Sequence, residues 1–149
     1  MIRMPGAALA ILLLSLSMPA LAQSPTAFAR VHDDASLQWG DCPEFMPAGC
    51  AIAVLHGDPA QPGADVFFRV PGGAQIPRHF HSSAERMVLV AGELEVTYDD
   101  QSPVTLRAGH YAYGPAQAPH SGRCRSPQPC VLFIAFDGPV DAIAGAPES

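Results

Sequence analysis

Short hydrophobic stretches, separated by glycine and proline, make up most of the chain from residue 51 onward. Within these stretches apolar residues either alternate with polar ones or follow one another for a few positions, which is typical of β-strands. The 16 prolines and 13 glycines disfavour long helices. The pattern predicts eight strands, at residues 51–55, 66–70, 75–81, 86–90, 93–98, 104–106, 110–113 and 131–136. Such short strands at close spacing favour an all-β, single-domain jelly roll of antiparallel strands.

The first 22 residues differ from the rest and have the pattern of a signal peptide. Arg3 supplies a positive charge, residues 7–14 form an apolar core, and Ala20-Leu21-Ala22 is a small-x-small cleavage site. A membrane anchor is the alternative, but the apolar stretch is shorter than the roughly 20 residues that a helix needs to span a bilayer. We therefore expect a bacterial protein that is exported to the periplasm or secreted, with no membrane insertion after processing.

The remaining chain is expected to divide at about residue 50. Residues 23–50 are rich in loop-forming residues and predict an N-terminal arm, whereas residues 51–149 predict the barrel domain. The full chain has 14 acidic residues and 8 basic ones, all arginine, and its formal net charge is −6. Proteins hold nucleic acid by neutralising its phosphates, so an acidic domain without a basic cluster argues against nucleic acid as a partner.

Four cysteines in an exported chain favour disulfide bonds. Four cysteines allow three connectivities, and the pairs Cys42–Cys50 and Cys124–Cys130 are favoured because each closes a short loop. The second pair would join the strand leaving His120 to the strand that begins near Cys130. Thiolate ligation of a soft metal is the alternative, but neither pair has the CxxC spacing of such sites.

Three histidines and one glutamate are spaced as ligands of a single metal ion. Successive side chains of a strand point to opposite faces, so His79 and His81 project from one face and Phe80 from the other. Glu85 follows after a short polar turn, and His120 lies further along the chain. Imidazole with carboxylate suits a divalent transition metal better than calcium or magnesium, which prefer oxygen ligands.

These residues fall in two motifs that resemble those of the cupin superfamily. The pattern GxxxxxHxHxxxExxxxxxG runs from Gly73 to Gly92, and GxxxxxPxxxxH runs from Gly109 to His120, with 16 residues between them. The resemblance implies a single double-stranded β-helix, the cupin barrel, in which His79, His81, Glu85 and His120 are the metal ligands. The polar Asn that often follows the last histidine in the family is absent here, so the resemblance does not indicate a substrate. It also implies a homodimer.

Several residues near the motifs are candidates for contact with a bound molecule. Met87 and Leu89 share the inward parity of Glu85 and could line a cavity, although ordinary core packing is favoured for Leu89. Tyr111 and Tyr113 share one face of a strand, and parity does not say whether that face is the inner or the outer one. His110 follows a glycine, which favours an exposed position on a turn.

Two functions remain open. The first is a mononuclear metal-dependent enzyme acting on a small organic molecule, for which the cupin resemblance supplies oxygenases and isomerases as precedents; no catalytic residue beyond the metal ligands is predicted. The second is a non-catalytic, metal-dependent module that binds or senses a small ligand. Iron, manganese, nickel, copper and zinc all accept this ligand set, so the sequence predicts one divalent transition metal ion per subunit without its identity.

Overall fold

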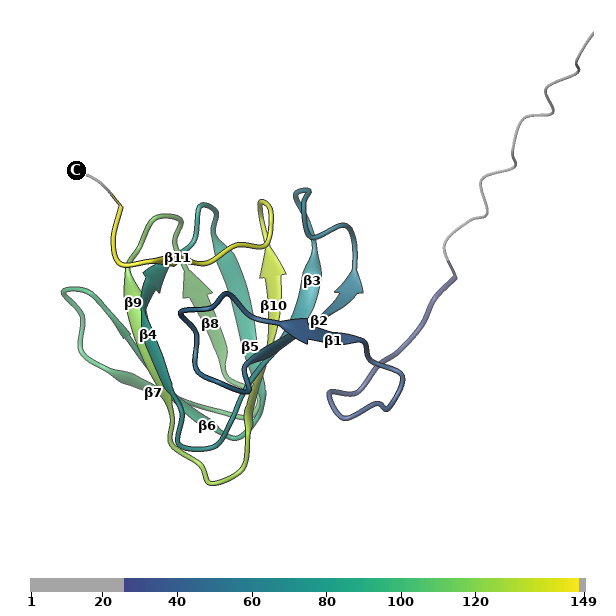
Figure 1. The fold of residues 1–149 in the computed structure, drawn as a ribbon, viewed down its shortest axis with the longest axis horizontal. Coiled ribbons are helices and arrows are strands. Elements are labelled where there is room, and N and C mark those ends of the chain that lie inside the picture. The colour runs from purple at the N-terminus through teal and green to yellow at the C-terminus, as the bar shows by residue number, and fades with distance from the viewer. Residues whose placement is uncertain (1–25, 148–149) are drawn as a thin grey trace, which may run out of the picture.

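The computed structural model describes residues 26–147, so the predicted signal peptide lies outside the described residues. These residues form two antiparallel β-sheets that face each other (Figure 1). One sheet has the strand order β1-β2-β3-β10-β5-β8 and the other the order β11-β4-β9-β6-β7. The strands are β1 (Trp39–Asp41), β2 (Ala51–His56), β3 (Asp65–Val70), β4 (Gln75–Phe80), β5 (Glu85–Ala91), β6 (Glu93–Tyr98), β7 (Val104–Arg107), β8 (Tyr111–Gly114), β9 (His120–Cys124), β10 (Cys130–Phe136) and β11 (Ile143–Ala144).

The predicted all-β class is confirmed, and each of the eight predicted strands has an observed counterpart, shifted at its ends by no more than a residue or so. The strand expected to leave His120 is β9. The prediction placed His110 in a strand, whereas β8 begins one residue later. The reason is a turn: the amide of His110 donates a hydrogen bond to the carbonyl of Arg107, and Gly109 has a φ of 87°.

Two short strands, β1 and β11, were not predicted. Each holds only two or three residues and is extended because a longer neighbour supplies its hydrogen-bond partners: β1 pairs with β2, and β11 pairs with β4. β1 belongs to the segment that we assigned to the N-terminal arm, and Trp39 lies opposite Ala53 in the sheet. The domain boundary at residue 50 stays a prediction, but part of the arm is built into the barrel wall.

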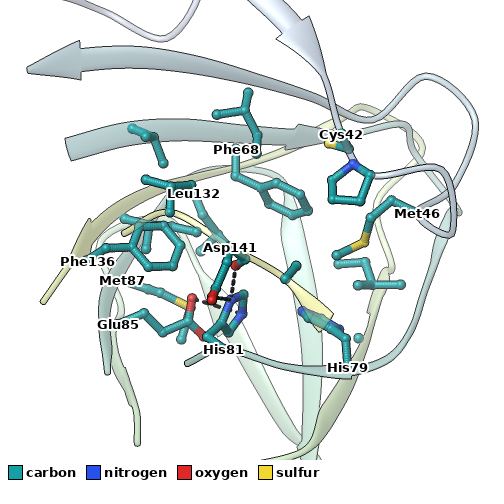
Figure 2. Close-up of a pocket in the computed structure, with 18 of the residues that line it drawn as sticks. Cys42, Met46, Phe68, His79, His81, Glu85, Met87, Leu132, Phe136 and Asp141 are labelled. Carbon is teal, nitrogen blue, oxygen red and sulfur yellow. Dashed lines mark hydrogen bonds and ion pairs between the residues drawn. The ribbon is translucent and has the colours of Figure 1, made fainter. Parts of the chain in front are cut away.

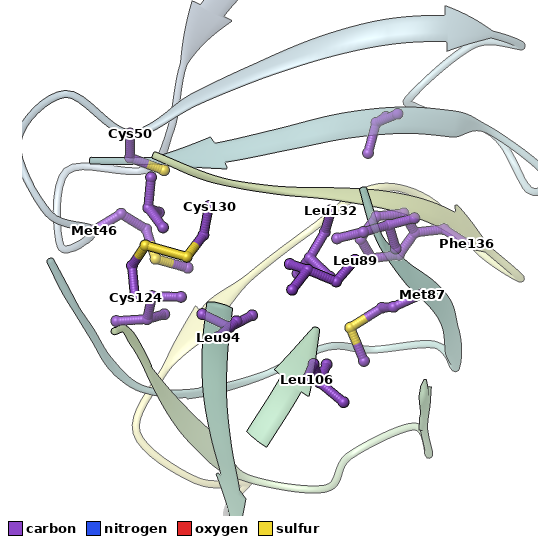
Figure 3. Packing of buried hydrophobic residues seen from close by; sticks show 14 residues of the cluster. Met46, Cys50, Met87, Leu89, Leu94, Leu106, Cys124, Cys130, Leu132 and Phe136 are labelled. Atoms are coloured by element: carbon purple, nitrogen blue, oxygen red, sulfur yellow. A yellow bond between two sulfur atoms is a disulfide. The ribbon is translucent and has the colours of Figure 1, made fainter. Parts of the chain in front are cut away.

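The core lies between the sheets and is formed by alternate residues of the facing strands (Figure 3). Leu89 of β5 and Leu94 of β6 are almost completely buried, as are Val66 and Val70 of β3. Burying one such side chain stabilises the fold by roughly 1.5–3 kcal/mol. Core residues such as Val66 and Leu94 also border the space between the sheets that is reached by the predicted ligands His79, His81, Glu85 and His120. No helix in the described part of the chain is long and apolar enough to cross a membrane.

The structure joins the cysteines in the two favoured pairs, Cys42–Cys50 and Cys124–Cys130. Cys42 lies just after β1, and Cys50 lies just before β2, so the first disulfide closes the loop between these strands. The second links the end of β9 to the start of β10 and therefore connects the two sheets (Figure 3). Two such pairs favour an oxidising, extracytoplasmic environment.

Loss of the inter-sheet disulfide should destabilise the barrel. Cys124 and Cys130 are both at most 1% exposed, and a bond that closes so short a loop is worth about 2–3 kcal/mol through the entropy of the unfolded chain. We expect the double variant C124S/C130S to lose about that much free energy of unfolding, measured by urea denaturation. Addition of a reductant should lower the stability of the wild type and of C42S/C50S. A double variant C124S/C130S as stable as the wild type would contradict the prediction.

Candidate metal centre

The four predicted ligand residues lie together at one end of the barrel. His79 is on β4, His81 follows β4 directly, Glu85 begins β5 and His120 begins β9. Their positions follow from strand pairing, because His79 lies opposite His120 in the β4–β9 register. All four side chains are buried, with exposed fractions between 2% and 7%. Polar groups are rarely buried so completely unless they bind or pair with something.

The three imidazole rings converge on one point. The ring centroids of His79 and His120 are 4.3 Å apart, those of His79 and His81 are 5.0 Å apart, and those of His81 and His120 are 5.3 Å apart. One nitrogen atom from each ring lies within 4.8 Å of the corresponding atoms of the other two. This spacing allows one metal ion to bind all three nitrogens.

Backbone hydrogen bonds hold each ring in the orientation that a metal ligand needs. In each ring Nδ1 lies within hydrogen-bond distance of a carbonyl oxygen: Pro77 for His79 (2.8 Å), Asp141 for His81 (2.5 Å) and Ala118 for His120 (3.0 Å). Since a carbonyl only accepts hydrogen bonds, each Nδ1 carries the proton and each Nε2 keeps a free lone pair. Metal-binding histidines are commonly fixed by such a hydrogen bond to the second ring nitrogen.

Burial keeps the imidazoles of His79 and His120 neutral. It lowers the pKa of His79 to about 3, and the nearby His120 contributes to the same shift. Burial likewise lowers the pKa of His120 to about 4, against an opposing hydrogen bond to the carbonyl of Ala118. A neutral imidazole is the form that donates a lone pair to a metal.

Glu85 completes the cluster. Its Oε2 is 3.5 Å from Nε2 of His81, and its Oε1 is 3.7 Å from Nε2 of His120. Among the described residues Oε1 has no hydrogen-bond partner, although it is buried. Burial raises the pKa of this carboxyl, opposed by the nearby His81. A buried oxygen without a partner, beside three free Nε2 lone pairs, fits a divalent transition metal.

Two further residues shape the glutamate's surroundings and were missed at the sequence level. Gly114 lies opposite Glu85 in the β5–β8 register, and a Cβ atom at this position would lie 2.8 Å from Oε1 of Glu85 and 2.5 Å from the hydroxyl oxygen of Tyr98. Tyr98 lies opposite His120 in the β6–β9 register, and its ring packs on the imidazole with the two ring centroids 4.7 Å apart. Its hydroxyl is buried and has no partner in residues 26–147. Burial and the charge of Glu85 both raise the pKa of Tyr98.

A cavity of about 380 Å³ adjoins the cluster. The histidines and glutamate form one wall, and the remaining walls are mostly hydrophobic, with Met46, Phe68, Leu132 and Phe136 among the residues that Figure 2 labels. The exposed residues Asp41, Pro43 and Pro59 also line it, so the cavity reaches the surface. The volume lies at the lower end of the range for small-molecule sites.

The segment between β10 and β11 also contributes to this site. The carbonyl of Asp141 accepts the hydrogen bond from His81, and its carboxylate accepts one from the amide of Ser82 at 3.0 Å (Figure 2). Asp141 is 60 residues from His81 in the chain, and no motif in the sequence pointed to it. Its contacts anchor the turn that carries His81 towards Glu85.

The remaining residues predicted near the motifs divide between the cavity wall, the core and the outer surface. Met87 lines the cavity, and Leu89 is core rather than cavity lining, as the sequence favoured. Tyr111 and Tyr113 are 61% and 55% exposed, so their shared face is the outer one and neither can contact a ligand in the cavity. His110 is exposed on its turn, as predicted.

Comparison with known proteins identifies the fold. A family model described as "Cupin domain" matches residues 66–136. An uncharacterized protein of Methanocaldococcus jannaschii is 33% identical over 46 residues, which are 31% of this chain and 40% of that protein. This chain thus matches less than half the length of that curated relative.

Solved structures resemble the whole barrel at low sequence identity. The DMSP lyase DddQ from Ruegeria pomeroyi superimposes with a TM-score of 0.63 and 22% identity, over 76% of this chain and 63% of that one. An acetylacetone dioxygenase from Acinetobacter johnsonii superimposes with a TM-score of 0.58 and 20% identity, over 78% of this chain and 77% of that one. An RmlC-like cupin from Shewanella frigidimarina superimposes with a TM-score of 0.57 and 22% identity, over 70% of this chain and 86% of that one. The family model that matches residues 66–136 and the shared fold together support a small cupin-superfamily domain in this chain.

Proposed function

We propose that this protein is an exported, mononuclear metal-dependent enzyme acting on a small organic substrate. The observation that carries the proposal is the convergence of three buried imidazoles and one buried carboxyl group on the wall of a cavity that reaches the surface. A purely structural metal site is usually closed on all sides by protein ligands, whereas a catalytic site keeps an open position. The cavity supplies that open side.

His79, His81, His120 and Glu85 would hold one divalent transition metal ion, which could be iron, manganese, nickel, copper or zinc. Such an ion supplies Lewis-acid or redox chemistry at the cavity wall. The backbone carbonyls of Pro77, Ala118 and Asp141 keep the imidazoles in the ligating tautomer. The hydrophobic walls exclude water from the reacting groups and position the substrate against them. Oxygenase-like and isomerase-like reactions both fit this arrangement.

Two structural neighbours support an enzymatic role for such a site. The DMSP lyase and the acetylacetone dioxygenase are, by their names, enzymes of small organic molecules. The barrel that they share with this chain therefore supports catalysis elsewhere, although fold alone does not determine function. The predicted signal peptide and the two disulfides support export to the periplasm or secretion. A homodimer stays a prediction from the family resemblance.

A non-catalytic module that binds or senses a small ligand is the alternative. One observation favours it: apart from the four cluster residues, the described residues that line the cavity offer only Asp41, Ser121 and Asp141 as side chains able to transfer a proton. Asp41 is exposed at the mouth, and Asp141 is engaged with the amide of Ser82. An enzyme built this way would rely on its metal and Glu85 for the chemistry.

Turnover by the metal-loaded protein tests the proposal. The full-length gene, expressed with its own leader and purified from the periplasm, should yield about one divalent transition metal ion per chain by elemental analysis. That protein should convert at least one member of a panel of phenols, diketones, keto acids and sugars, followed by mass spectrometry. Chelator-treated protein and the variant Glu85→Gln should be inactive controls. One metal per chain without turnover of any compound would support the binding module instead.

A further inference from the structure

We infer that the substrate has a polar end that meets the metal and an uncharged, hydrophobic body, so that carboxylated or phosphorylated molecules are excluded. This inference rests on the proposed function and adds the chemical class of the ligand. Its basis is the composition of the cavity walls away from the cluster. Those walls contain hydrophobic side chains from both sheets, including Ile52, Phe68 and Ile134 of one sheet and Ile76 and Leu94 of the other.

The part of the chain that the structure describes places no lysine or arginine side chain on the cavity wall. The chain contains no lysine, and no arginine among residues 26–147 lines the cavity. Four arginines instead pair with acidic residues on the outer surface: Arg78 with Asp99, Arg86 with Asp137, Arg107 with Glu93 and Arg125 with Glu95. Arg69 packs over the ring of Trp39, 4.0 Å from its centroid. A substrate carboxylate or phosphate would find no cation in the cavity other than the metal.

The charged residues that line the cavity outside the cluster are both acidic. Asp41 lies at the mouth on β1, and Asp141 lies beside His81, with its carboxylate 3.9 Å from Nδ1. Both would repel an anion on its way in. Transfer of an ionised carboxylate into hydrophobic surroundings costs several kcal/mol unless it is paired, and a charged group remote from the metal would have no partner.

The size of the cavity limits the ligand further. Its volume of about 380 Å³ lies in the lower part of the roughly 300–1,000 Å³ range of small-molecule sites, which favours a compact ligand. A single aromatic ring with short substituents fits this space.

A matched pair of ligands tests the inference. 4-Methylcatechol and 3,4-dihydroxybenzoate carry the same metal-binding catechol and differ only in a remote methyl or carboxylate group. We expect the zinc-loaded protein to bind 4-methylcatechol at least tenfold more tightly, measured by anaerobic calorimetry, because the carboxylate would be buried without a partner. In the chelator-treated protein, 4-methylcatechol should still bind more tightly than 3,4-dihydroxybenzoate.

Two arginine variants sharpen the test. Val54 lines the cavity from β2 and is 44% exposed, so Val54→Arg should be tolerated and should place a cation at the wall. This variant is expected to reduce or reverse the difference in affinity between 4-methylcatechol and 3,4-dihydroxybenzoate. Val104 on β7 is 56% exposed and does not line the cavity, so Val104→Arg should leave the preference unchanged.

The outcomes separate this inference from the proposed function. Equal or tighter binding of 3,4-dihydroxybenzoate would overturn the inference, as would the absence of binding by both ligands. Failure of zinc to bind, measured by elemental analysis, would contradict the proposed metal centre; the ligand order in the metal-free protein would then still decide whether the walls exclude anions.

Discussion

Replacing His81 with alanine is expected to abolish metal binding while the barrel still folds. His81 occupies the centre of the proposed ligand set: its Nε2 is 3.5 Å from Glu85, and its ring lies about 5 Å from the rings of His79 and His120. Loss of a residue that merely orients a ligand costs about 10–100-fold in metal affinity, so loss of a ligand should cost at least 100-fold. The metal content of purified protein, measured by elemental analysis, should fall from about one ion per chain to near zero.

The fold should survive this change because His81 contributes no apolar side chain to the core and takes part in neither disulfide. The side chain of His81 packs against Phe136, with ring centroids 5.5 Å apart, so the alanine leaves a small cavity that costs a few kcal/mol at most. Circular dichroism should therefore show an unchanged β-sheet signal. His110→Ala is the matched control, since this histidine is exposed on a turn and lies outside the cluster. Retention of metal by His81→Ala, or its loss in His110→Ala, would refute the proposed ligand set.

Much of this site could be predicted from the sequence because it depends on local periodicity. The alternation of a strand fixes His79 and His81 on one side, and the apolar run after Glu85 fixes the inward parity of Met87. Both consequences are visible in the structure, where these side chains line the same cavity. The resemblance of the two motifs to those of cupins implied the fold, and the matching family model agrees with it.

The residues that were missed depend on strand register, which no local pattern reveals. Tyr98 reaches the cluster only because β6 pairs with β9 so as to set it opposite His120, and Gly114 matters only because it lies opposite Glu85. Asp141 lies in a loop without periodicity and orients His81 through its backbone carbonyl, a group that every residue possesses. Its amino-acid identity could not have indicated this contact. The cavity walls depend in the same way on how two sheets face each other.

Gly114→Ala is expected to weaken both the fold and the metal site, because the added methyl group has no room. Its Cβ would lie 2.5 Å from the hydroxyl oxygen of Tyr98 and 2.8 Å from both Cγ and Oε1 of Glu85. Glu85 is only 2% exposed and cannot swing into solvent to relieve the contact. Overpacking of this kind typically costs 1–3 kcal/mol, which urea denaturation of the metal-free protein should show. Displacement of the carboxylate should also lower zinc affinity at least tenfold, measured by competition with a chelator.

A double variant identifies the contact that causes this loss. Tyr98→Phe removes the atom nearest to the new methyl group, and in the wild type it removes a hydroxyl that has no partner among the described residues. Tyr98→Phe alone should therefore change stability little, whereas in the Gly114→Ala background it should restore at least about 0.5 kcal/mol, since residues in contact couple by such amounts. Gly40→Ala is the matched control. This strand glycine lies outside the left-handed φ region, and a Cβ atom there would meet nothing closer than the carbonyl oxygen of Ile52 at 3.8 Å. If Gly114→Ala matched the wild type in stability and zinc affinity, Glu85 would not be held in the confined position from which it is proposed to bind the metal.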